Sequence, residues 1–536
     1  MKKQSIAKGF AILSIAGMLG KVLSLLYIPF LKHIIGPEGY GIYMATYQVY
    51  TFIFVITNAG VPVAISKLIS EFTATENHKN ALKAFKIARL MLLGIGTLMA
   101  IATVVFAKPL ANLVKYNRAY LSVLCLAPSV LFTAVSCAYR GYFQGRGNMT
   151  PTAISQIVEQ FINIVFSLIF AAFFIGKGLE QGVAGATVGT SLGALISALY
   201  LIYYYSKHGK IRPYKHKGEI KREHRYTKKQ LARKIIQYGV PITLCVGMNY
   251  AGNIVDLWNT KSRLLVAGLS NSEANILYGQ LGQYQQLINV PIAIVSSLAA
   301  AILPAISGAI ACGNKKKAKG NINYSFRLCF LITLPSAIGL TVLSSPIYKM
   351  IHLGEGSDIM KYGAVVLILM ALSQIQTTIL QSIGKLYLAT FYSVIGIVAK
   401  ILVNYTLIAI PSINIMGAIY GSVTGFLIPI ILNHLTIRNS LRVKISLIKI
   451  SIKPLISSLL MGAVVFIGYK LFNSIFILTN IHYLTVVLST VSSILLGVFA
   501  YGMALILTRG IRKKDLNQFP PKIVKIIPGF MKRMIR

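Results

Sequence analysis

The sequence predicts an all-α integral membrane protein with about 14 transmembrane helices, arranged as two pseudo-symmetric six-helix lobes plus two C-terminal helices. Hydrophobic residues make up 55% of the chain and charged residues only 12%, whereas about a quarter of a soluble domain is charged. The mean hydropathy is +0.68. Apolar stretches of roughly 20 to 28 residues also recur along the chain, which is the length that a membrane-spanning helix needs.

The expected spans follow one another from residue 6 to residue 508. The first continues past Lys21 for about 26 residues, which is longer than the apolar core of a cleavable signal peptide, roughly 7 to 15 residues. In chain order, the expected spans are residues 6–31, 40–69, 84–107, 119–140, 151–175, 182–205, 235–260, 276–311, 320–345, 358–383, 387–410, 416–437, 451–473 and 482–508.

The basic residues indicate the orientation of these spans. The net charge is +42. If successive loops alternate sides, 40 of the 54 Lys and Arg residues lie on the side of the N-terminus, ten lie opposite and four lie inside apolar stretches. This positive-inside bias places both termini on the cytoplasmic side of the membrane. We therefore expect the basic loops to contact anionic lipids, and no nucleic acid to be bound.

Short repeats indicate how the spans are grouped. "GATVGTSLG" at 185–193 matches "GAIYGSVTG" at 417–425, and "EGYG" at 38–41 is echoed by "ILYG" at 276–279. Repeats with an even number of spans have parallel topology, as in some transporters. The expected domains are an N-lobe at 1–206, a basic cytoplasmic linker at 207–234, a C-lobe at 235–437, two helices at 438–508 and a basic cytoplasmic tail at 509–536.

Of the 12 acidic residues, only Glu159 and Asp256 lie deep in apolar stretches. A lone carboxylate there is costly, so each is expected to face a partner or a wet cavity. Glu159 has Asn163 on the same helical face, four residues later. Two interpretations stay open: Glu159 lines a cavity, or it pairs with Arg140 or Arg146 as a clamp between helices.

Asp256 lies on a polar helix face that includes Asn253 and Asn259. In the second half, Lys400 and Asn404 are again four residues apart. We expect Asp256 either to pair with Lys400, or to form a cation or proton site, or to lie at a solvated helix end. No metal site is predicted, although Asp256 and Asn404 are the candidates for sodium ligands.

Two further residues are expected in the same cavity. Lys21 lies midway along the first span, where a cation faces either the interface by snorkelling or a cavity, and a phosphate suits it as a ligand. Tyr47 belongs to a stripe at 40, 43, 47 and 50 that either packs or contacts a sugar or headgroup. No HExxH or GxxxxGK[ST] motif is present, so no enzymatic activity and no cofactor are expected.

"YRGYFQGRGNMTPTAISQIVEQ" at 139–160 resembles the signature of the stage V sporulation protein B group of polysaccharide-biosynthesis membrane proteins, and "GKVLSLLYIPFLKHIIGPEGYGIYMATYQ" at 20–48 is also similar to it. This group belongs to the multidrug/oligosaccharidyl-lipid/polysaccharide exporter superfamily. The resemblance implies a V-shaped pair of six-helix lobes that work by alternating access. Lys21 matches one of the arginines of the cavity in lipid II flippases, whereas Tyr27 stands where a second is found.

The function implied is a flippase that moves an undecaprenyl-diphosphate-linked saccharide, peptidoglycan precursor lipid II above all, from the inner to the outer leaflet for cell-wall or spore-cortex synthesis. The resemblance also implies a bacterial cell membrane as the location, and a monomer is expected. The alternatives are a flippase for another lipid-linked polysaccharide unit, a cation-coupled drug exporter, and a non-transporting scaffold that recruits wall-synthesis enzymes. The sodium site of some relatives uses acids and amides that Asp256 and Asn404 match, with Lys400 in their midst.

Overall fold

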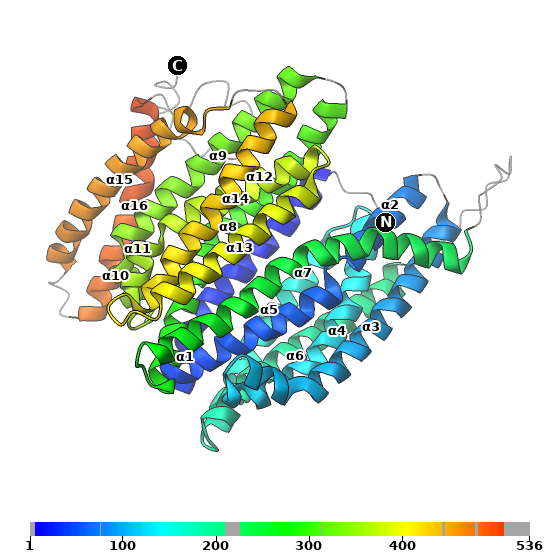
Figure 1. Ribbon diagram of the computed structural model, residues 1–536, viewed down its shortest axis with the longest axis horizontal. Helices are drawn as coiled ribbons and strands as arrows, with labels where there is room; N and C mark the ends of the chain where they lie inside the picture. The colour runs from blue at the N-terminus through cyan, green and yellow to red at the C-terminus, as the bar shows by residue number, and fades with distance from the viewer. Residues whose placement is uncertain are drawn as a thin grey trace. The chain divides into compact units, whose positions relative to one another are not determined.

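A computed structural model describes residues 6–74, 77–209, 226–311, 314–441, 445–476 and 481–508. Every element in this part of the chain is helical (Figure 1). The all-α class is therefore confirmed. Most of the basic linker and all of the basic tail lie outside the described residues.

The helices follow one another with short connections. Their bounds are α1 Ile6–Asn58, α2 Val61–Ala74, α3 His78–Leu113, η1 Asn117–Ala119, α4 Tyr120–Gly145, α5 Thr150–Ile175, α6 Leu179–Tyr204, η2 Tyr205–Gly209, α7 Lys228–Val266, α8 Asn271–Ala311, α9 Lys315–Val342, α10 Ser344–Met350, α11 Ser357–Gly363, α12 Val365–Ser382, α13 Leu386–Leu407, η3 Asn414–Met416, α14 Gly417–Leu441, α15 Leu447–Phe476 and α16 His482–Leu507.

Eleven stretches of the described residues are long and apolar enough to cross a membrane. One of them, 12–73, contains most of two expected spans, 6–31 and 40–69. A break at Gly36, whose φ is 70° and ψ is 172°, separates the two parts of α1. The protein is thus a multi-pass membrane protein, and the number of fourteen spans stays a prediction.

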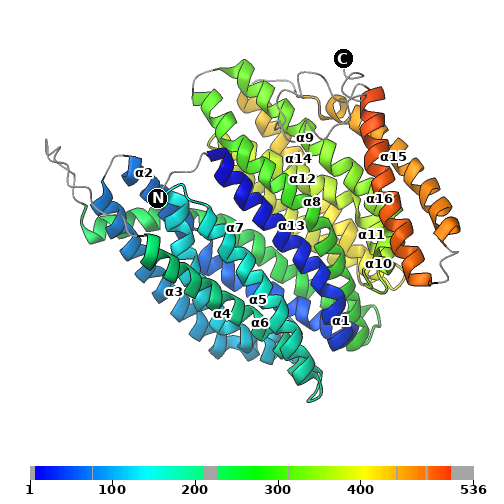
Figure 2. The same cartoon turned by 180° about the vertical axis from the view of Figure 1, so that it is seen from behind.

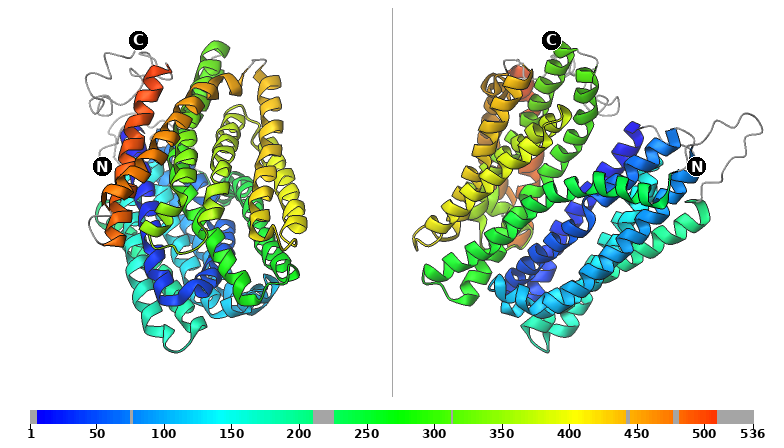
Figure 3. Two further views of the ribbon diagram at one scale, coloured as in Figure 1. Left: turned by 90° about the vertical axis from the view of Figure 1, so that its left-hand side faces the viewer. Right: turned by 45° about the vertical axis from the view of Figure 1, so that its right-hand side comes forward.

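The chain divides into two compact units. Unit 1 comprises 1–286 and 397–418, and unit 2 comprises 287–396 and 419–536. In unit 1, α3, α4 and α6 run beside one another (Figure 2). In unit 2, α15 and α16 form a hairpin beside α9, drawn orange to red in Figure 3. The lobe boundaries expected from the repeats remain a prediction.

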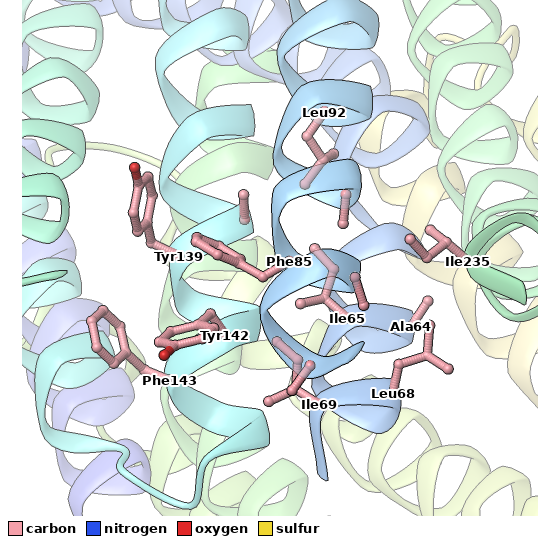
Figure 4. Packing of buried hydrophobic residues seen from close by; sticks show 14 of the residues in the cluster. Ala64, Ile65, Leu68, Ile69, Phe85, Leu92, Tyr139, Tyr142, Phe143 and Ile235 are labelled. Atoms are coloured by element: carbon pink, nitrogen blue, oxygen red, sulfur yellow. The ribbon is translucent and has the colours of Figure 1, made fainter. Parts of the chain in front are cut away.

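One core of unit 1 joins α2, α3 and α4. Phe85 of α3 lies with its ring centroid 5.4 Å from that of Tyr139 and 4.5 Å from that of Tyr142, both on α4, and Figure 4 shows the Phe85 ring beside the two tyrosines. Ile65 of α2 packs into the same cluster. Aromatic pairs at these separations stabilise by about 0.5–1.5 kcal/mol beyond the area they bury.

The first residues of α7 are tied to this core. Thr227 caps α7 in a reciprocal capping box with Gln230. Lys83 of α3 donates a hydrogen bond of 2.8 Å to the carbonyl oxygen of Tyr226. Lys67 of α2 lies 3.8 Å from the centre of the Tyr238 ring. The end of the basic linker is therefore held against the helices of unit 1.

Candidate functional site

The first polar cluster of unit 1 is centred on Arg140 of α4 and Glu159 of α5. Arg140 Nη2 lies 2.6 Å from Glu159 Oε2, and the two side chains are 14% and 27% exposed. Arg140 also donates to the hydroxyl oxygens of Ser155 on α5 and Ser197 on α6, each at 3.0 Å. The structure thus forms the Arg140 pairing, one of the two interpretations left open for Glu159. Arg146 instead lies 5.7 Å from the Tyr142 ring.

Close approach of two helix backbones creates this cluster. A Cβ on Gly193 of α6 would lie 2.5 Å from the carbonyl oxygen of Glu159, and one on Gly189 would lie 2.6 Å from that of Asn163. Only glycine fits at such distances. The "GATVGTSLG" repeat therefore brings α6 against the polar face of α5, as small residues do between membrane helices.

Asn163 joins Tyr47 through Thr190. The Asn163 Oδ1 atom accepts hydrogen bonds from Ser167 Oγ at 2.9 Å and from Thr190 Oγ1 at 3.1 Å. Thr190 is in turn hydrogen-bonded to the hydroxyl of Tyr47. Since the Thr190 hydrogen is given to Asn163, Tyr47 is the donor in that pair. Two predicted residues are therefore brought together by a threonine that the sequence reasoning missed.

The tyrosine stripe of α1 continues this polar region as a row of rings. The centroids of Tyr43 and Tyr47 are 4.6 Å apart, and those of Tyr47 and Tyr50 are 5.9 Å apart. Each tyrosine is one helical turn from the next, so the row follows from the helix period. The stripe is packed within unit 1, which is one of the two interpretations that its spacing allowed.

The second polar cluster of unit 1 joins α7 to α13. Lys400 Nζ lies 2.7 Å from Asp256 Oδ2, and the two side chains are 23% and 14% exposed. Asn404 Nδ2 donates to the other carboxylate oxygen. Asn259 Nδ2 donates to the carbonyl oxygen of Ile401 at 2.9 Å and holds α13 in register. Of the three interpretations left open for Asp256, the structure therefore shows the ion pair with Lys400.

Lys21 stands apart from both clusters. It is exposed on α1 and makes no hydrogen bond or ion pair with the residues that the structure describes. One turn further on, Ser24 Oγ accepts a hydrogen bond of 2.9 Å from Gln160 Nε2 of α5, the neighbour of Glu159. Lys21 is therefore the predicted site residue whose charge has no partner within the described chain.

The residues that the sequence reasoning missed are small and polar. Ser155, Ser197 and Thr190 satisfy the donors and acceptors of Arg140 and Asn163. Serine and threonine are common on apolar helices, where they usually bond the backbone of the preceding turn. Their spacing therefore carried no signal. Among the described residues, no three His, Cys, Asp or Glu side chains gather as metal ligands.

Comparison with protein families gives two matches. The family model described as "Polysaccharide biosynthesis protein" matches residues 6–309, and the MatE model matches residues 281–406. The first match covers more than half of the 536 residues.

Two curated relatives come from Bacillus subtilis (strain 168). Stage V sporulation protein B is 28% identical over 83% of this chain and 86% of its own length. Lipid II flippase MurJ is 24% identical over 86% of this chain and 88% of its own length. The resemblance noted in the sequence is thereby confirmed.

Solved structures share the fold. A lipid II flippase MurJ in an inward closed conformation aligns with a TM-score of 0.67 and 15% identity over 93% of this chain and 99% of that chain. An inward-facing multidrug resistance MATE family transporter of the MOP superfamily aligns with a TM-score of 0.64 and 16% identity over 81% of this chain and 98% of that chain. At 15% and 16% identity, these two alignments show that the chain has this fold.

Proposed function

The chain belongs to the polysaccharide biosynthesis protein family, and from this premise we propose that it is a flippase for an undecaprenyl-diphosphate-linked saccharide. Lipid II is the cargo we propose first. The cargo moves from the inner to the outer leaflet by alternating access between two six-helix lobes, and both termini lie in the cytoplasm. The basic linker and tail contact anionic lipids there.

The observation that carries this proposal is the state of the deep charges. Glu159 and Asp256 are each paired with a base, whereas Lys21 has no partner in the described chain. A membrane-embedded cation without a counter-ion favours an anionic cargo, and a lysine suits the phosphate groups of a diphosphate. We assign Lys21 to the cavity as its unpaired charge. We assign Tyr47, Asn163, Asn404 and the two ion pairs, whose polar groups already have partners in the chain, to the cavity wall.

The membrane potential supplies a driving force for such a cargo. Each negative charge that moves outward across an inside-negative membrane gains about 2.3 kcal/mol per 100 mV. An anionic lipid can therefore be exported without ATP.

A cation-coupled drug exporter is the second candidate, because the fold is also that of a MATE family transporter. Such an exporter needs carboxylates that are free to bind and release a cation. Since both deep carboxylates are paired with bases, we place the flippase first.

The experiment is complementation in a bacterium from which the lipid II flippase is depleted. We would express the wild type and the Lys21→Ala, Lys21→Arg and Lys108→Ala variants, quantify each in the membrane, and measure lipid II in the outer leaflet. Lys108 is the matched control, because it is an exposed lysine on α3. Rescue by the wild type, Lys21→Arg and Lys108→Ala but not by Lys21→Ala is expected.

The other outcomes separate the alternatives. A well-inserted wild type that fails to rescue contradicts lipid II as the cargo and leaves another lipid-linked saccharide. Rescue by Lys21→Ala contradicts the assigned site. A scaffold requires that replacing 207–234 abolishes rescue while Lys21→Ala is silent.

A further inference from the structure

Unit 1 also contains a polar pocket, which is separate from the Arg140–Glu159 cluster and from the Asp256–Lys400 cluster. It has a volume of about 370 Å³, within the range of small-molecule sites. It is lined by residues of the second part of α1, the segment 115–118 around η1, the last part of α7 and the start of α8. The residues that matter here are Glu38, Lys115, Tyr116, Arg118, Lys261 and Asn275, which we call the Lys261 pocket.

The Lys261 pocket carries more positive than negative charge. Three cations line it against one carboxylate, Glu38. Glu38 is already used by Arg118, whose Nη1 lies 3.1 Å away, and Arg118 also lies 3.8 Å from Glu180. Neither Lys115 nor Lys261 forms an ion pair with a carboxylate of the described chain. Glu38 also attracts the Lys261 ammonium electrostatically, so a single carboxylate of the pocket serves three cations, and a surplus of two positive charges remains.

Lys261 is buried, with only 1% of its surface exposed. Its ammonium donates to the carbonyl oxygen of Asn271 at 3.0 Å and to the side chain of Asn275, and it lies 4.7 Å from the centre of the Tyr116 ring. An ammonium has three donors, and these bonds use two of them. A buried charge is costly unless it is well compensated, and the one carboxylate that acts on Lys261, Glu38, is shared with Arg118. An anion in the pocket would therefore stabilise the Lys261 ammonium further.

Further groups of the pocket have no partner in the described chain. The Tyr116 hydroxyl is buried and has no hydrogen-bond partner there, although such groups are nearly always satisfied. The side-chain amides of Asn117 and Asn271 line the pocket and make no hydrogen bond with described residues. The exposed amides of Asn117 and Asn271, beside the pocket's cations, are suited to a ligand that carries hydroxyl groups as well as a negative charge.

The backbone around the pocket is held in place. A Cβ on Gly41 would lie 1.9 Å from the carbonyl oxygen of Asn275, so α1 and α8 touch directly beside the pocket. Ser270 and Glu273 form reciprocal hydrogen bonds of 2.8 and 3.3 Å at the start of α8. Lys115 has a φ of 60° because it is the left-handed residue that ends α3, and the Tyr116 N–H donates a hydrogen bond of 2.9 Å to the carbonyl oxygen of Ala111 there.

We propose that the Lys261 pocket binds a small hydroxylated anion, a sugar phosphate or a sugar acid, with Lys115 and Lys261 neutralising its charge and the free amides binding its hydroxyls. This site is separate from the proposed cargo site and does not depend on the identity of the cargo. The three cations belong to the ten basic residues that the charge count assigns to the outer side, so under that topology the ligand arrives from outside the cell.

The test is a calorimetric titration of the purified full-length chain in phosphatidylcholine nanodiscs. The probes are glucose 1-phosphate, glucuronate, inorganic phosphate and glucose. Glucose 1-phosphate and glucuronate are expected to bind, inorganic phosphate to bind several-fold more weakly, and glucose not to bind. Lys115→Gln and Lys261→Gln are each expected to weaken binding about tenfold, because each removes one of the positive charges that neutralise the anion.

Lys177→Gln is the matched control, because Lys177 is exposed in the same unit and lies 5.3 Å from the Phe174 ring, as Lys115 lies 6.0 Å from that of Trp258. It is expected to bind within twofold of the wild type. Because Lys261 is buried, its variant is compared only if it melts like the wild type, and the exposed Lys115 tests the pocket in any case.

Three results would overturn the proposal. No saturable binding of glucose 1-phosphate or glucuronate would remove the site. Equal weakening by Lys177→Gln would mean that diffuse surface charge, not the pocket, attracts the anion. Loss of glucose 1-phosphate binding when the discs contain phosphatidylglycerol would assign the pocket to a lipid headgroup instead of a soluble sugar.

Discussion

Lys400 of α13 places its ammonium 2.7 Å from the carboxylate of Asp256 on α7, across 144 residues of sequence. Asn404 donates to the same carboxylate. An ammonium therefore stands where a carboxylate and an amide could otherwise hold a metal cation. We interpret Lys400 as a built-in cation, which makes a sodium ion at Asp256 and Asn404 unnecessary.

Removing this ammonium should create a sodium response. Lys400→Gln leaves the Asp256 carboxylate unpaired, and breaking such a pair costs about 3 kcal/mol when it is largely buried. We expect a lower melting temperature that rises again in NaCl but not in KCl, while the wild type melts alike in both. Thermal melts of the purified protein measure this. The neutral double variant Asp256→Asn with Lys400→Gln is the control and should recover stability without a sodium response. A sodium-dependent wild type would contradict the interpretation of Lys400.

Neutralising Glu159 should destabilise unit 1. Glu159→Gln leaves Arg140 without its counter-ion among Ser155 and Ser197, so we expect a loss of about 3 kcal/mol. The matched control is Glu180→Gln, whose partner Arg118 is 57% exposed at 3.8 Å, and which should cost less than about 1 kcal/mol. Melting in detergent would reveal the difference. Equal losses for the two variants would mean that burial adds nothing to the Arg140 pair.

A side chain at Gly41 should force α1 and α8 apart. Because its Cβ would lie 1.9 Å from a backbone oxygen, Gly41→Ala is expected to destabilise the protein by about 3 kcal/mol. Gly94→Ala is the control: this helical glycine of α3 has nothing within 4 Å of a Cβ, so alanine should stabilise it by up to about 1 kcal/mol. Chemical or thermal unfolding measures the stability of the two variants. Similar stabilities would contradict the close approach of the α1 and α8 backbones at Gly41.

The orientation can be tested by cysteine labelling in intact cells. In a chain whose five native cysteines are alanine, a membrane-impermeant maleimide should label Lys177→Cys and should label Lys316→Cys only after lysis. Both lysines are exposed, so the side of the membrane on which each lies determines whether the maleimide reaches it in intact cells. Labelling of Lys316→Cys in intact cells would reverse the orientation that the positive-inside count predicts.

Within a single helix, the sequence was a good guide to the site. The four-residue spacing correctly placed Glu159 with Asn163 and Lys400 with Asn404 on shared faces, and the tyrosine stripe forms the expected row of rings. These relations depend only on the 3.6-residue period of the helix, which every helical segment shares. Apolar length likewise sufficed for the membrane class, because the bilayer itself sets that length.

Only the tertiary structure showed which side chains on different helices meet. Nothing in the sequence distinguished Arg140 from Arg146 as the partner of Glu159, or indicated that Ser197 of α6 would complete the cluster. From the sequence, Lys261 was only one of the basic residues in the loops. In the structure it is buried beside Tyr116. Helix period and apolar length are local or bilayer-imposed properties, and so they can be read along the chain. Which side chains meet depends on which helices become neighbours and on where glycines such as Gly41 and Gly193 let their backbones touch, and that is set by long-range packing.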